Sequence, residues 1–182
     1  MSRQPEKPII IVNSEGAVEK TMRFPAPEFS SQHYLAAQQI TSSDARTGRW
    51  ISAYRLADGF FLFNEERPLS FRGWFVEPIP FPALVTKRVN GGVSTELQDK
   101  PLPAARSATF STSAVYVLFG GASSDRNKVI DAYSTENGSY LQSFLLPEAV
   151  REIAWYNGGF YTLRDDPEPE LAYWRPVGTT IP

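Results

Sequence analysis

A pattern of strand, polar turn, second strand and proline recurs along this chain. The complete version has its turn at residues 134–138 and ends at Pro147. A shorter version near the N-terminus has its turn at residues 13–16 and ends at Pro25, and another apolar run ends at Pro78. Apolar segments of this length, joined by turns that contain Gly, Asn and Ser, indicate antiparallel hairpins.

The rest of the sequence offers no competing helical pattern. Fifteen Pro and twelve Gly are spread among the 182 residues, and no window repeats apolar residues at the spacing of a helix face. A four-stranded unit that repeats about every 40–50 residues is typical of a β-propeller, in which each unit forms one blade. We therefore predict an all-β fold, a partial β-propeller of antiparallel four-stranded blades.

We interpret residues 1–182 as a single propeller segment. The predicted units are an outer hairpin of a truncated blade at residues 8–25, a blade at 33–78, an inserted hairpin or irregular blade at 79–104, a blade at 105–147 and an incomplete last blade at 150–176. Because the first and last units lack strands, we expect open sheet edges and self-association through them.

Composition excludes several classes of partner. The formal net charge is −2, so the chain has no overall basic field to attract nucleic acid or an anionic membrane surface. It contains no Cys, which removes disulfides and thiolate chemistry. The longest early apolar run, residues 9–12, is too short for a membrane span or a signal peptide, so we expect neither.

Four segments carry a resemblance to a known group: residues 75–82, 115–121, 129–133 and 161–167. They resemble the C-terminal half of bacterial six-bladed β-propeller proteins of the NHL/TolB-like group, over about residues 45–176. The resemblance implies a binding or assembly surface more often than an enzyme, and in many members a periplasmic or exported location. It also implies a longer ring, so this chain is expected to be a portion of one or to be completed by a second chain.

Carboxylates gather in one loop, where Asp165, Asp166, Glu168 and Glu170 lie within six residues. Carboxylate oxygens are the ligands that Ca²⁺ prefers, but the spacing is not that of an EF-hand loop. A polar loop that connects two strands is the competing interpretation, and we favour it. We predict no tight cation site there and no cofactor.

Basic side chains surround the strand that contains Trp50. Arg46, Arg49 and Arg55 are expected to line a face that accepts an anionic or sugar-like ligand by ion pairing and stacking. The aromatic residues of this region are expected to fill the space between blades instead.

Alternation of apolar residues also predicts the core. The residues expected to be buried are Ile51, Tyr54, Phe61, Phe63, Val115, Val117, Phe119, Ile130, Leu145, Ile153, Trp155, Tyr161 and Leu163.

The sequence favours a binding protein over an enzyme. His33 is the only histidine, and no G-x-S-x-G motif is present, which disfavours a Ser-His-Asp hydrolase. We predict a non-enzymatic propeller that offers a binding or scaffolding surface to a protein or small molecule, with specificity in the loops at one rim. The alternatives are a metal-dependent hydrolase of the lactonase type and a partial product without independent function.

Overall fold

The fold is all-β and antiparallel throughout the described part of the chain. The computed structural model describes residues 8–23, 38–64, 67–122, 124–164 and 167–176. These hold fifteen strands in two four-stranded sheets, one three-stranded sheet and two separate hairpins. Within these ranges no helix is long and apolar enough to cross a membrane. The sheets have the form of partial propeller blades, as the sequence predicts.

The first four-stranded sheet is a simple meander. Its strands, in order across the sheet, are β3 (Gln39–Asp44), β4 (Arg49–Tyr54), β5 (Phe60–Asn64) and β6 (Arg67–Gly73). β3 extends to Asp44, because residues 41–44 pair in register with β4.

The second and third sheets follow the same plan. The second contains β9 (Ala105–Phe110), β10 (Ala114–Phe119), β11 (Val129–Ser134) and β12 (Tyr140–Leu145). The third contains β13 (Glu152–Tyr156), β14 (Gly159–Arg164) and β15 (Glu170–Trp174).

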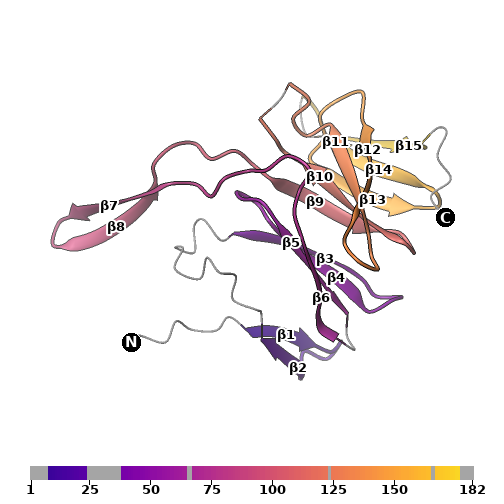
Figure 1. The fold of residues 1–182 in the computed structure, drawn as a ribbon, viewed down its shortest axis with the longest axis horizontal. Helices are drawn as coiled ribbons and strands as arrows, with labels where there is room; N and C mark the ends of the chain where they lie inside the picture. The colour runs from indigo at the N-terminus through magenta and orange to yellow at the C-terminus, as the bar shows by residue number, and fades with distance from the viewer. Residues whose placement is uncertain (1–7, 24–37, 65–66, 123, 165–166, 177–182) are drawn as a thin grey trace.

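The three sheets meet through their first strands. β9 lies against β3 on one side and against β13 on the other, as the ribbon shows (Figure 1). Propeller blades meet in this way around their common axis. The loops that precede β9 and β13 and those that follow β4 and β10 therefore lie at one rim.

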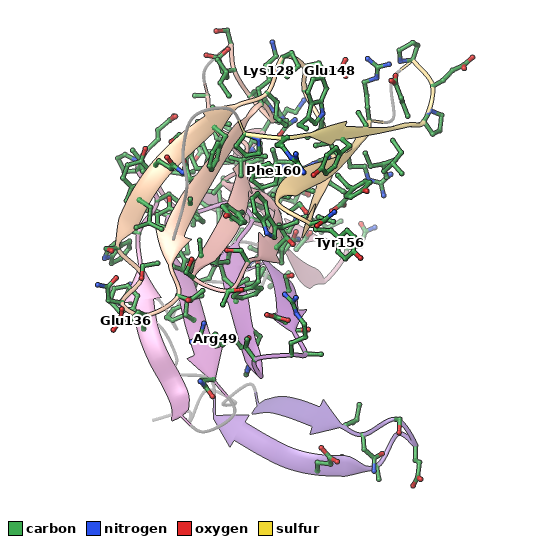
Figure 2. All side chains as sticks on the ribbon, turned by 90° about the vertical axis from the view of Figure 1, so that its right-hand side faces the viewer. Arg49, Lys128, Glu136, Glu148, Tyr156 and Phe160 are labelled. Atoms are coloured by element: carbon green, nitrogen blue, oxygen red, sulfur yellow. The ribbon has the colours of Figure 1, made fainter. Side chains whose placement is uncertain are left out.

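Apolar side chains fill the spaces between neighbouring sheets. The core between the first and second sheets includes Phe60, Leu62, Val115, Val117 and Tyr133. The core between the second and third sheets includes Tyr116, Leu118, Ile130, Ile153 and Phe160. Phe160 points from the third sheet toward the second (Figure 2).

Most of the predicted core is buried, but not all of it. Leu145 is 67% exposed, so its predicted burial is wrong. It lies on β12, the strand farthest from the line where the sheets meet, and the first sheet does not cover that strand. Trp155, Tyr161 and Leu163 are only partly buried.

Two hairpins stand apart from these sheets. β1 (Pro8–Val12) pairs with β2 (Val18–Arg23), and β7 (Leu84–Val89) pairs with β8 (Gly92–Leu97). The β7–β8 hairpin projects away from the three sheets (Figure 1). Positive φ angles at Asn90 (48°) and Gly91 (84°) make its tight turn.

Candidate functional site

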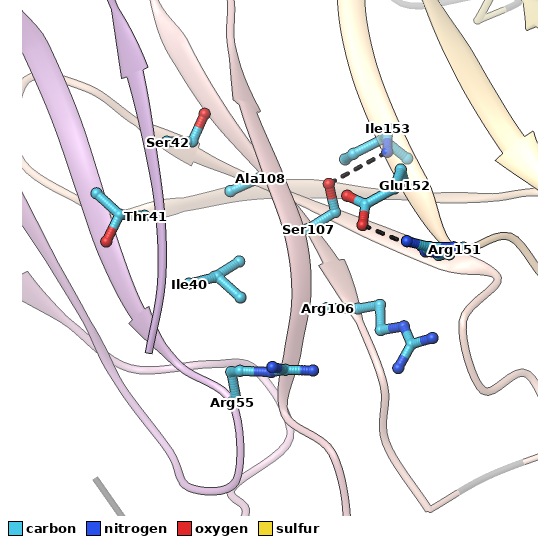
Figure 3. A pocket seen from close by; sticks show the side chains of 10 residues that line it. All are labelled: Ile40, Thr41, Ser42, Arg55, Arg106, Ser107, Ala108, Arg151, Glu152 and Ile153. Carbon is cyan, nitrogen blue, oxygen red and sulfur yellow. Dashed lines mark hydrogen bonds and ion pairs between the residues drawn. The ribbon is translucent and has the colours of Figure 1, made fainter. Parts of the chain in front are cut away.

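A cavity of about 580 Å³ lies where the first strands of the three sheets meet. It is lined by residues 40–42 of β3, residues 106–108 of β9, residues 151–153 at the start of β13, and Arg55 (Figure 3). Each sheet therefore contributes residues to one concave surface. Ile40, Ala108 and Ile153 supply its apolar part.

Each sheet places one arginine in this cavity. Arg55 directly follows β4, beside the start of β3, because Tyr54 pairs with Gln39. Arg106 is the second residue of β9, and Arg151 directly precedes β13. The three guanidinium groups lie on one side of the cavity, and Thr41 and Ser42 lie on the other (Figure 3).

Backbone hydrogen bonds between rim loops hold the arginines in place. The Ala104 N–H donates to the Arg55 carbonyl at 2.7 Å, and the Gly120 N–H donates to the Ala104 carbonyl at 2.7 Å. The Arg151 N–H donates to the Leu163 carbonyl at 2.7 Å. The main chain at Arg55 and Arg151 is therefore fixed before any ligand arrives, which lowers the entropic cost of binding.

Hydroxyl groups of β9 also fix β13. The backbone N–H of Ile153 donates to the Ser107 hydroxyl at 3.2 Å, and that of Trp155 donates to the Thr109 hydroxyl at 3.0 Å. These bonds join the second and third sheets at the cavity. The spacing between Arg106 and Arg151 follows from this junction.

The cavity is positively charged. Glu152 is the one acidic residue among the ten that line it, and its carboxylate lies 3.7 Å from the Arg151 guanidinium. Both side chains are about half exposed. Among the described residues no carboxylate pairs with Arg55 or Arg106.

A second cavity of about 230 Å³ adjoins the first and shares two of its arginines. Arg55 and Arg106 line both cavities. The second cavity adds Lys100, from the segment before β9, and Arg126, from the loop between β10 and β11. None of its nine lining residues is acidic.

The three arginines named from the sequence separate in the structure. Arg46 lies in the β3–β4 turn, where its Nε donates to the Asp44 carboxylate at 3.1 Å. Hydrogen bonds from Arg46 hold the pKa of Asp44 below its usual value. Arg49, at the start of β4, donates to the Thr112 carbonyl and the Thr135 hydroxyl. Of the three, only Arg55 lines the cavities.

The acidic loop does not come together as a described cluster. Asp165, Asp166 and also His33 lie outside the described residues. Glu168 is exposed, and Glu170 forms an ion pair with Arg164, which also pairs with Glu148. In the described ranges no group of three His, Cys, Asp or Glu residues could hold a metal ion.

Sequence reasoning missed Arg106, Arg151, Lys100 and Arg126. The sequence does contain a signal for two of these arginines. Arg106 and Arg151 both lie near the start of the first strand of their units. Alignment of the units by their first strands would have brought these two arginines together.

Comparison with known proteins adds little. No protein-family model and no curated protein matches the chain. The crystal structure of the computationally designed Ika4 protein is similar over 75% of this chain and 91% of that one, with 10% identity and a TM-score of 0.33. The designed Ika8 protein gives 75% and 45%, with 11% identity and a TM-score of 0.32. Fold and site together describe an all-β protein with blade-like sheets and a basic cavity between them.

Proposed function

We propose that this chain is a non-enzymatic binding protein that holds a small anionic ligand in the cavity between its three sheets. The observation that carries the proposal is the convergence of Arg55, Arg106 and Arg151, one from each sheet, on that cavity. Guanidinium groups present a planar fork of donors that matches phosphate and carboxylate oxygens. Because the main chain at Arg55 and Arg151 is already fixed, binding an anion there orders only the side chains.

The charge of the cavity argues against the metal-dependent hydrolase. A divalent cation at a propeller axis needs carboxylate or amide oxygens from several blades. Among the described residues, three arginines and one carboxylate line the cavity at this position. Like charges repel, so the cavity favours an anion over a cation.

The size of the basic region favours a small ligand over nucleic acid. The chain as a whole carries a net charge of −2, while the basic residues near the axis line two cavities of about 580 and 230 Å³. Nucleic acid requires positive charge along an extended surface. The larger cavity is within the size range of pockets that bind small molecules.

The resemblance to the bacterial six-bladed NHL/TolB-like group favours a binding role. Its support is the sequence of residues 75–82 and 161–167 together with the blade-like sheets. In such a ring, further blades would extend the wall of the cavity beyond β3 and β13.

Calorimetric titration with inorganic phosphate at low ionic strength tests the proposal. We expect saturable binding that Arg151→Gln weakens at least about fivefold, because a charge-assisted hydrogen bond is lost. Arg151→Lys keeps the charge and should recover part of the affinity. The matched control is Arg88→Gln, which removes the same charge from the exposed β7–β8 hairpin. Equal weakening by both Gln variants, or no binding, would refute the proposal.

A further inference from the structure

We infer that the ligand carries at least two negatively charged groups, phosphate or carboxylate, which occupy the two adjoining cavities at the same time. This inference rests on the proposed function and adds the class of ligand. The two cavities share one wall. Arg55 and Arg106 line both, so a ligand held by these two residues faces Arg151 on one side and Lys100 and Arg126 on the other.

The structure brings the residues of the second cavity together through close packing of two rim segments. The Gly121 N–H donates to the Pro103 carbonyl at 2.9 Å. A Cβ atom at Gly120 would overlap that carbonyl oxygen, so this approach requires glycine at position 120. The approach places the loop that carries Arg126 beside the segment that carries Lys100.

Both basic residues come from segments with restricted main chains. Lys100 precedes Pro101, which fixes its own φ and limits the conformations of Lys100. The loop after Gly121 is closed by hydrogen bonds from the Asn127 N–H to the Phe119 carbonyl at 3.2 Å and from the Lys128 N–H to the Asp125 carbonyl at 2.9 Å. Hydrogen bonds and a proline thus restrict the main chain on both sides of the second cavity.

Charge balance then favours a ligand with several anionic groups. A single small anion in the first cavity meets the three arginines there and leaves Lys100 and Arg126 without a contact to it. A second anionic group joined to the first reaches these residues at a high effective concentration. Thr41, Ser42 and the apolar side chains of Ile40 and Ala108 remain for the uncharged part of the ligand.

Titration with a short series of probes tests this inference. Inorganic phosphate carries one anionic group, and tripolyphosphate carries three in a chain. Acetate carries one carboxylate and tricarballylate carries three. Comparison of the two series therefore distinguishes a phosphate ligand from a carboxylate ligand. In the series that binds more tightly, we expect the probe with three anionic groups to bind at least about tenfold more tightly than the probe with one.

The decisive readout is selective loss in variants of the second cavity. Arg126→Gln and Lys100→Gln should each weaken tripolyphosphate or tricarballylate binding about fivefold to tenfold and change binding of the single group less than about twofold. Arg151→Gln should weaken both kinds of probe, and Arg88→Gln neither. Arg126→Lys retains the charge, and thermal melting of every variant checks that it folds.

The outcomes separate the inference from the proposed function. If phosphate binds through Arg151 but Arg126→Gln and Lys100→Gln leave the longer probe unaffected, the ligand uses one cavity, so the inference is wrong and the proposed function stands. If the longer probe gains affinity equally in Arg126→Gln and the wild type, the gain is general charge attraction, which also refutes the inference. If no probe of either series binds, both fall.

Discussion

The guanidinium of Arg49 on β4 donates a hydrogen bond to the hydroxyl of Thr135, 2.9 Å away in the turn between β11 and β12. A second bond, to the Thr112 carbonyl at 3.0 Å, reaches the loop between β9 and β10. Arg49 therefore joins the first two sheets at the end of β4 opposite Arg55. Figure 2 shows Arg49 at the same end of the sheets as Glu136, which lies in that turn.

This geometry predicts a structural role for Arg49. Arg49→Met removes both hydrogen bonds and should lower the free energy of unfolding by about 1–2 kcal/mol. Phosphate binding should stay unchanged, because Arg49 does not line either cavity. Urea denaturation and calorimetry measure the two effects, and Arg88→Met is the control on an exposed hairpin. Loss of phosphate binding with unchanged stability would show that Arg49 contacts the ligand.

Burial at Val117 predicts a large effect of a charge. Val117 is 0% exposed, between the first and second sheets, and Val117→Asp should lower the free energy of unfolding by more than about 3 kcal/mol because it buries an unpaired carboxylate. Leu145→Asp is the matched control, since Leu145 lies in the same sheet but is 67% exposed. Its cost should stay below about 1 kcal/mol. Similar melting temperatures for the two variants would contradict the packing described.

The contrast between these two residues shows how far sequence can predict the fold. Alternating apolar residues separated by turn signals predict the strands and the burial of Val115, Val117 and Phe119 on one face of β10. They do not predict that Tyr116 and Leu118 on its other face are also buried, because the third sheet covers them. The same alternation on β12 predicts burial of Leu145. Coverage of an outer strand depends on how far the neighbouring sheet extends, and that is a tertiary property.

The site was less predictable than the fold. Proximity in sequence suggested that Arg46, Arg49 and Arg55 share a face. Arg49 begins β4 and Arg55 follows its last residue, so the length of one extended strand separates them. Arg106 and Arg151 lie far from Arg55 in the sequence and meet it only because first strands of neighbouring sheets pack together. Without knowing where β9 and β13 begin, a reader of the sequence cannot see that Arg106 and Arg151 lie at similar positions in their sheets.

The buried carboxylate of Asp131 predicts a pH dependence of stability. Asp131 is 3% exposed and accepts hydrogen bonds from the Ser143 hydroxyl at 2.5 Å and the Tyr133 hydroxyl at 3.4 Å. Burial raises the pKa of Asp131 above its usual 3.8 despite these bonds, and the charge of Glu77 adds to the rise. Between 3.8 and the raised pKa, the folded state holds more protons than the unfolded state. The contribution of Asp131 to stability is therefore largest at low pH and falls as pH rises through the raised pKa.

The variant Asp131→Asn isolates this contribution. Urea denaturation from about pH 4 upward should show a smaller decline in the free energy of unfolding for the variant than for the wild type. Ser143→Ala is the companion variant, because it removes a hydrogen bond to the ionised carboxylate and should steepen the decline. Parallel pH profiles for wild type and Asp131→Asn would show that Asp131 titrates normally.

The acidic loop should not bind a cation tightly. Glu170 already pairs with Arg164, and Glu168 is exposed, so adding millimolar Ca²⁺ should change the melting temperature negligibly. Differential scanning fluorimetry measures this directly. A rise of several degrees that disappears in the Asp165→Asn, Asp166→Asn double variant would refute the prediction and favour the metal-dependent hydrolase.

The outer face of the third sheet predicts self-association. Tyr156 and Leu171 are each 68% exposed and Tyr173 is 41% exposed, and the Tyr161 and Tyr173 rings lie 4.9 Å apart on this face. An exposed apolar sheet face of this kind is stabilised when it is covered, and we expect a second copy of the chain to cover it. Light scattering should show a mass that rises with concentration, and Leu171→Glu with Tyr173→Ser should reduce the rise. Val93→Ser, at an equally exposed position on the β7–β8 hairpin, should not. A monomer at all concentrations, or equal loss in the control, would show that this face does not bind a second copy.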